Sequence, residues 1–222
     1  VNNPIFNFVN NEFLGTDLGT DLTLSFGNVN SDGYVDVVVG NANGFINLFL
    51  GIGNMEFEYM GEDSEIDLSG ASSPDLFDYN GDGYDDLVLG DSSGNVWFYI
   101  NDWQDGDCWP NCFSSLISDL VPTINTYTSP TIHDINNDGY FDIILGTQAD
   151  NVLVYINNGS SLTDGTLPFE ALANTNYLFP YLGNYTHLAL GSLRGLDKLD
   201  AIVGISTGGM YHISANTCYI GD

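Results

Sequence analysis

An internal repeat is the feature that most constrains the fold of this chain. Four segments align without gaps, and their first residues are Asn28, Asp78, Asp134 and Ser192. Each segment opens with a short polar loop whose last residue is Asp36, Asp86, Asp142 or Asp200, so the intervals are 50, 56 and 58 residues. A glycine follows four residues later each time, at Gly40, Gly90, Gly146 and Gly204. Periods of this length are typical of chains built from repeated supersecondary units.

Each repeat unit has the pattern of β-strands throughout. In the first unit an alternating stretch (residues 21–27) precedes the loop, and a β-branched run (35–40) follows it. A four-residue turn, another apolar segment and a looser segment complete the unit. These runs are too short for helices and are bounded by Gly, Asn, Asp and Ser. Four strands in about 50 residues match one blade of a β-propeller.

We therefore predict an all-β fold, a β-propeller of about four blades with four antiparallel strands each. A β-sandwich with similar loops is the alternative, and gapless fourfold recurrence disfavours it. The predicted single domain spans 1–222: closing strands or a partial blade at 1–18, then blades at 19–68, 69–121, 122–180 and 181–222, the last one degenerate. Residues 4–11 and 11–17 resemble third and fourth strands of a blade. They are expected to close the last blade, to pair with a neighbouring molecule, or to belong to a larger propeller.

Three of the four loops share a pattern of oxygen-bearing residues at positions 1, 3, 5 and 9. The side chains are Asn28, Asn30, Asp32 and Asp36; Asp78, Asn80, Asp82 and Asp86; Asp134, Asn136, Asp138 and Asp142. Position 7, held by Tyr34, Tyr84 and Tyr140, would supply a backbone carbonyl. Oxygen ligands at this spacing suit Ca²⁺. The loops therefore predict about three calcium ions, and metal-free Asp/Asn turns are the alternative.

Two departures from this pattern are informative. An EF-hand would need a Glu at position 12, where this chain has Val39, Leu89 and Leu145. The fourth loop has Leu196 at position 5 and Arg194 at position 3. We expect the Arg194 guanidinium to pair with Asp200 or Asp197 and to replace the missing ion. The alternative is that Arg194 and Lys198 are solvated surface cations.

The charge of the chain excludes some partners. It has 30 acidic and 2 basic residues, a formal charge of −28. A nucleic-acid partner is excluded because phosphate binding needs a cationic track, and anionic membrane surfaces are disfavoured for the same reason. No apolar run is long enough for a spanning helix, so no membrane insertion is expected. Three Ca²⁺ would bring the charge from −28 to about −22 and relieve the crowded aspartates.

Several features point to a secreted, extracellular or cell-surface protein. Cys108 and Cys112 are close enough for a small disulfide loop in an oxidising compartment, whereas Cys218 has no obvious partner. Asn158 and Asn184 begin glycosylation sequons. The chain starts at Val1 without an initiator Met or a signal peptide. It is therefore expected to be a processed or excerpted sequence.

The three complete loops resemble those of the FG-GAP/VCBS repeat family, in which integrin-type propeller blades carry Ca²⁺ in a loop of the DxNxDGxxDL type. The resemblance covers roughly residues 20–215, and the fourth loop departs from it. It implies a secreted or surface-exposed propeller that serves adhesion, recognition of glycans or proteins, or attachment of enzymes. It implies no activity of its own. In the family the calcium stabilises the blade, and we carry only that role over to these loops.

Recognition is the function that the sequence favours, and catalysis is not expected. No Ser or Cys nucleophile motif lies near His133, His187 or His212. Trp103 and Trp109 lie in an interrupting loop with carboxylates, a composition that suits sugar stacking, although they could instead pack on their own blade. The alternative is a structural subunit in a homo-oligomer or filament joined by strand exchange, with Cys218 as a lock. A polysaccharide-acting enzyme is the third candidate.

Overall fold

In the computed structural model, every regular element of the described residues is a β-strand. The structure describes residues 16–63, 65–68, 70–103, 109–117, 121–124, 126–148, 152–160, 168–172, 182–191 and 199–214. The predicted all-β fold is therefore confirmed. A search of this part of the chain finds no helix with the length and apolarity that crossing a membrane requires.

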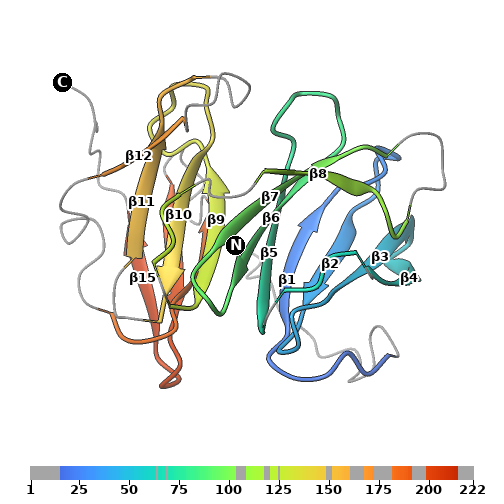
Figure 1. The fold of residues 1–222 in the computed structure, drawn as a ribbon, viewed down its shortest axis with the longest axis horizontal. Helices are drawn as coiled ribbons and strands as arrows, with labels where there is room; N and C mark the ends of the chain where they lie inside the picture. Colours follow the sequence, from blue (N-terminus) through green and yellow to red (C-terminus); the bar gives the residue numbers. More distant parts are fainter. Residues whose placement is uncertain are drawn as a thin grey trace, which may run out of the picture.

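The strands form four antiparallel sheets, one for each repeat unit (Figure 1). The first sheet contains β1 (Thr23–Gly27), β2 (Asp36–Gly40), β3 (Ile46–Gly53) and β4 (Glu56–Glu62). The second contains β5 (Ser72–Phe77), β6 (Asp86–Asp91), β7 (Val96–Asn101) and β8 (Phe113–Ile117). The third contains β9 (Thr128–His133), β10 (Asp142–Thr147), β11 (Val152–Asn157) and β12 (Phe169–Ala171). The fourth has three strands among the described residues: β13 (His187–Gly191), β14 (Asp200–Gly204) and β15 (Met210–Ser214).

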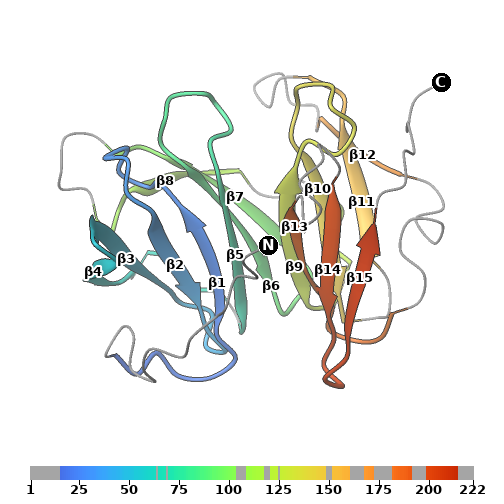
Figure 2. The same cartoon turned by 180° about the vertical axis from the view of Figure 1, so that it is seen from behind.

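The strands of each sheet pair in chain order, as a meander. The first strand of each unit pairs with the second, so that Gly27 lies opposite Asp36 and Phe77 opposite Asp86. Each acidic loop therefore joins the first two strands at one end of its sheet. The turn between the second and third strands lies at the other end. Figure 2 shows the same arrangement from behind, with β13 and β14 in view.

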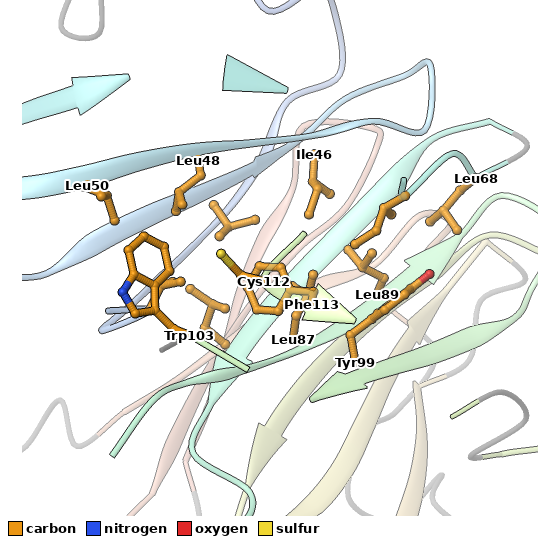
Figure 3. Packing of buried hydrophobic residues seen from close by; sticks show 14 residues of the cluster. Ile46, Leu48, Leu50, Leu68, Leu87, Leu89, Tyr99, Trp103, Cys112 and Phe113 are labelled. Carbon is orange, nitrogen blue, oxygen red and sulfur yellow. The ribbon is translucent and has the colours of Figure 1, made fainter. Parts of the chain in front are cut away.

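The core consists of layers between successive sheets. In β6, Leu87 and Leu89 pack in one cluster with residues of the first sheet, and Val88 packs in the next cluster with residues of the third sheet. Second strands are therefore buried on both faces, which explains why their sequences are continuous apolar runs. Figure 3 shows the first layer, in which Leu50, Leu48 and Ile46 of β3 lie on one side and Trp103, Phe113 and Leu87 on the other.

The first strands of all four sheets line one cavity of about 520 Å³. Its walls come from residues 22–26, 73–76, 129–133 and 187–190. The four repeat units thus share a central space, as blades around an axis would. A closed ring stays a prediction, and the segments 1–15 and 215–222 that bear on it lie outside the described residues.

A repeated contact between a glycine and a hydroxyl group joins each sheet to the next. A Cβ on Gly40, Gly90 or Gly146 would collide with a backbone carbonyl at the start of the next unit, that of Ser72, Thr128 or Thr186. The side-chain hydroxyl there accepts a hydrogen bond from the backbone just after the glycine, at 3.0, 3.0 and 2.9 Å. Only a residue without a side chain permits this approach.

The outer ends of the array lack this contact. In the first unit, Leu22 stands where the later units have a Ser or Thr, and it is 46 % exposed. Among the described residues, no atom lies within 4 Å of a Cβ built on Gly204. The contact therefore holds three junctions and not a junction between the last and the first unit.

Candidate metal loops

The first residue of the second and third loops gathers the loop backbone around a carboxylate. Asp78 Oδ1 accepts hydrogen bonds from the N–H groups of Gly81 and Asp82 at 2.8 and 3.1 Å, and its Oδ2 accepts one from Gly83 at 3.0 Å. Asp134 binds the N–H groups of Asp138 and Gly139 in the same way, at 3.2 and 2.9 Å. The two loops therefore have the same local geometry.

Positions 3 and 5 also repeat their geometry, in all three loops. The Asn side-chain amide at position 3 donates to the Asp carboxylate at position 5, at 3.0, 2.9 and 2.9 Å. The other oxygen of that carboxylate accepts from the N–H of the Tyr at position 7, at 2.8, 2.9 and 2.9 Å. Asp32, Asp82 and Asp138, which occupy position 5, are all exposed. Their remaining lone pairs therefore face solvent or an ion.

Position 9 is buried in all three loops. Asp36, Asp86 and Asp142 are 0 % exposed. One carboxylate oxygen accepts the N–H of the second loop residue at 2.7, 3.0 and 3.0 Å. The other accepts an N–H at or near the end of the third strand, that of Gly51, Asn101 or Asn157, at 2.8, 2.8 and 2.9 Å. Each of these aspartates thus ties its loop to the third strand of its sheet.

Burial raises the pKa of these aspartates above the ordinary range, and the backbone hydrogen bonds only partly offset the effect. The pKa rises to about 6 for Asp36 and for Asp86. The pKa of Asp142 is raised for the same reason. Neighbouring loop carboxylates contribute in the same direction, because like charges disfavour ionisation. A cation in the loop would reverse this balance.

The donor set of the loops fits a hard cation. Among the described residues, no three His, Cys, Asp or Glu side chains are arranged as a metal site. The carboxylates would therefore need the Asn oxygens, the Tyr carbonyls and water to complete a coordination shell of oxygen atoms. An ionised carboxylate has about four acceptor positions, so those of positions 1 and 5 keep capacity for an ion. Asn28 Oδ1, at position 1 of the first loop, is buried without a hydrogen-bond partner.

A bridge that the sequence analysis missed connects the first two loops. Asp85 Oδ2 accepts the N–H of Asn28 at 2.6 Å, and the Asp85 N–H donates to the Asn28 carbonyl at 3.0 Å. The side-chain amide of Asn101 donates to the carbonyls of Val29 and Asp85, at 2.7 and 2.9 Å. Val35 and Phe141 occupy the position of Asp85 in the other two loops. An acidic residue at this one position was the available signal.

The predicted sugar-stacking tryptophans lie mostly inside the molecule. Trp103 is 7 % exposed and belongs to the core between the first two sheets, where Figure 3 shows its ring beside Leu50. Trp109 packs against the same core and lies edge-on to Phe113, with ring centroids 6.4 Å apart. Packing therefore replaces the expected stacking role at Trp103, because its ring has no free face. Cys112 is disulfide-bonded, and Cys108 lies outside the described residues.

The remaining predicted positions are placed only in part. Asn158 and Asn184 are both exposed. In the fourth unit, Asp200 is buried and its Oδ1 lies 3.3 Å from Nε2 of His212. The proposed partner Arg194, together with Lys198 and Asp197, lies outside the described residues. Cys218 does so as well.

One serine does lie beside a histidine, which the sequence analysis did not anticipate. Ser129 Oγ is 3.0 Å from Nδ1 of His187, and the Tyr127 hydroxyl is 3.3 Å from Nε2. Ser129 is 5 % exposed and also shares a hydrogen bond with Ser73, at 3.0 Å. A phenol, not a carboxylate, faces the second ring nitrogen. The arrangement thus differs from an activated nucleophile, in which a third group orients the base.

Comparison with known families agrees with the repeat. The FG-GAP-like repeat model matches twice, over residues 28–89 and 78–145. The two matches contain the three oxygen-rich loops and together cover more than half of the chain. No curated protein matches the sequence. On the strength of these two matches, the chain belongs to the FG-GAP-like repeat family.

Proposed function

We propose that this chain is an extracellular recognition module, a β-propeller whose blades are stabilised by calcium. The observation that carries the proposal is the repeated loop geometry. Three loops orient the same oxygens by the same hydrogen bonds, and their position-5 carboxylates are exposed, with acceptor capacity left for an ion. Asn28, Asn30, Asp32, Tyr34 and their counterparts in the other two loops would hold the ions.

Binding is favoured over catalysis because the polar groups make structural contacts within and between the sheets. The buried aspartates accept backbone N–H groups, and in the Ser129–His187 pair the second ring nitrogen of the histidine lies beside the Tyr127 hydroxyl. An FG-GAP-like repeat family assignment agrees with a recognition or adhesion role, with a glycan or an extracellular protein as ligand. A propeller loop scaffold suits such a role because loops carry most binding surfaces.

A structural subunit is the second candidate, and the fourth sheet favours it. That sheet has three strands among the described residues, with β15 at its edge and most residues of β15 exposed. An edge of this kind can accept a strand from another molecule. In that case the chain would form a homo-oligomer or filament.

Native mass spectrometry in the presence of calcium tests these proposals together. We expect about three bound Ca²⁺ per chain, as the three oxygen-rich loops require. A chain that binds none would contradict the calcium assignment. A monomer at all concentrations would contradict the structural-subunit candidate.

Arrays of glycans and of extracellular proteins then test the recognition function. Binding to neither kind of array would contradict that function.

A further inference from the structure

A second cavity of about 760 Å³ lies at the end of the sheets opposite the acidic loops. It shares Leu22, Thr23 and His187 with the central cavity and is therefore its mouth. We call it the mouth cavity. Equivalent positions of the four repeat units line it. In each unit, one lining residue lies two places after the repeated glycine; these residues are Ala42, Ser92, Gln148 and Ser206. A second lining residue in each unit directly precedes the Ser or Thr of the junction, or Leu22 in the first unit. These residues are Asp21, Ala71, Tyr127 and Tyr185.

The four units place different residues at these equivalent positions. The first two units supply Asp21, Ala71 and other small side chains, whereas the third and fourth supply Tyr127, Gln148 and Tyr185. The Tyr127 and Tyr185 rings pack together with centroids 5.7 Å apart, and Tyr127 lies 5.5 Å from the His187 ring. The mouth cavity thus has an aromatic wall and a wall of small residues. The junctions between sheets do not require this difference.

The aromatic wall exposes one ring and several polar groups. Tyr185 is 40 % exposed, whereas Tyr127 is 7 % exposed and supports it from behind. Gln148, Ser92 and Ser206 are exposed at the rim and carry both donor and acceptor groups. A volume of about 760 Å³ lies within the usual range of small-molecule sites. An exposed aromatic face beside mixed donors and acceptors is suited to a ring that carries hydroxyl groups.

The charges of the residues that line the mouth cavity disfavour an anionic ligand. Among the described lining residues there is no Lys or Arg, and Asp21 is the one carboxylate. Partial desolvation lowers the pKa of His187, which favours the neutral ring. Anionic ligands are therefore repelled by a chain of charge −28. A cation would use the carboxylate and the ring faces but none of the hydroxyl and amide donors.

We propose that the mouth cavity binds a neutral sugar, which stacks on Tyr185 and forms hydrogen bonds with Gln148 and the rim hydroxyls. This proposal rests on the recognition function proposed above and assigns it to one site. The site lies at the end of the sheets away from the acidic loops. Sugar binding is therefore independent of direct contact with calcium, provided that the fold is intact.

Isothermal titration calorimetry with single sugars tests the proposal. The probes are glucose, galactose, mannose, fucose and N-acetylglucosamine, with tetramethylammonium as the cationic probe. We expect at least one sugar to bind, and Tyr185→Ala to weaken its binding about tenfold or more. Gln148→Ala should weaken it as well. Tyr59→Ala is the matched control, because Tyr59 is 41 % exposed and lies on the outer strand β4.

The possible results separate this site from the broader function. Equal affinities of wild type and folded Tyr185→Ala would overturn the site, even if a glycan array still showed recognition elsewhere. Binding of tetramethylammonium without any sugar would overturn the ligand class. If no probe binds but the protein array gives a ligand, the sugar proposal is wrong and recognition stands. Thermal unfolding of each variant verifies that it is folded.

Discussion

Buried and half-buried carboxylates form the most specific contacts at the scale of single residues. Besides position 9 of the loops, Asp75 on β5 lies on the wall of the central cavity. Its Oδ1 accepts the Ser25 hydroxyl at 3.0 Å, and its Oδ2 accepts the Ile132 N–H at 2.7 Å. One side chain thus connects the first strands of three sheets. Burial raises the pKa of Asp75 to about 6.

The raised pKa of Asp75 predicts a pH dependence of stability. The folded state holds a proton that the unfolded state releases near the ordinary pKa of 3.8. The protonated Asp75 side chain therefore contributes its full stabilisation below pH 3.8. This contribution to the free energy of unfolding decreases as the pH rises through about 6. Its upper bound is about 3 kcal/mol. In urea unfolding, the free energy of unfolding of the wild type should increase relative to that of Asp75→Asn as the pH is lowered from 7 to 5.

Asp67→Asn is the control for this prediction, because Asp67 is exposed. It should keep the pH profile of the wild type. Parallel profiles of wild type and Asp75→Asn would contradict the role that we assign to the buried carboxylate.

At the scale of strands and loops, the junctions between sheets carry most of the specificity. Each junction combines an apolar layer, a glycine at the end of the second strand and a hydroxyl at the start of the next sheet. Because interiors are close-packed, a single added methyl group at such a contact has to displace backbone. The same substitution at the free end of the array displaces none of the described atoms.

Gly90 and Gly204 make a matched pair for testing the junction. Gly90→Ala places a Cβ against the Thr128 carbonyl and the Pro130 ring, and should lower the free energy of unfolding by about 1–3 kcal/mol. Gly204→Ala meets no described atom within 4 Å and should change stability by less than about 1 kcal/mol. Chemical denaturation measures both. Similar losses in the two variants would contradict the junction contact.

The Asp85–Asn28 bridge predicts that calcium binding at the first loop depends on a residue of the second loop. Asp85→Ala leaves the Asn28 N–H without its acceptor, so position 1 of the first loop loses its support. We expect calorimetric titration with calcium to show a weakened first site and unchanged binding at the third loop, where Phe141 replaces the acid. A titration curve identical to the wild type would disprove the coupling. Asp67→Asn again provides the control.

At the scale of the whole molecule, charge opposes folding and the core favours it. The chain carries a formal charge of −28, and this self-repulsion destabilises the compact state. Layers of buried side chains between the sheets offset it. A cation that binds only the folded loops adds stability by mass action.

Removal of calcium should therefore lower the melting temperature markedly. At about one hundred times its dissociation constant, one bound ion adds about 2.7 kcal/mol to the free energy of unfolding. The three oxygen-rich loops should make the effect large. Differential scanning calorimetry in calcium and in excess EDTA measures it, and magnesium serves as the control ion. An unchanged melt in EDTA would rule out a structural role for calcium.

The strands could be predicted from the sequence because their signals are local. Alternation, β-branched runs and the Gly and Asn turns identified the strand segments of each unit, and the period identified the sheets. The geometry within each loop is local too, since Asp82 bonds to residues two to four positions away. Such contacts involve neighbours in the chain, so their spacing is visible without a fold.

The hydrogen bonds between sheets could not be predicted, because they join residues that are far apart in sequence, at separations such as 31, 39 and 57 positions. Nothing next to Asp75 distinguishes it from the other acidic residues, and the one signal for Asp85 is an acid at a loop position where the other two loops have Val35 and Phe141. The sequence left open whether Trp103 stacks on a sugar or packs inside the molecule, and the packing between the first two sheets places it in the core. The mouth cavity likewise exists only where four distant turns meet. Chain-local forces thus specify each sheet, whereas the burial and polarity of a side chain depend on which other sheet packs against it.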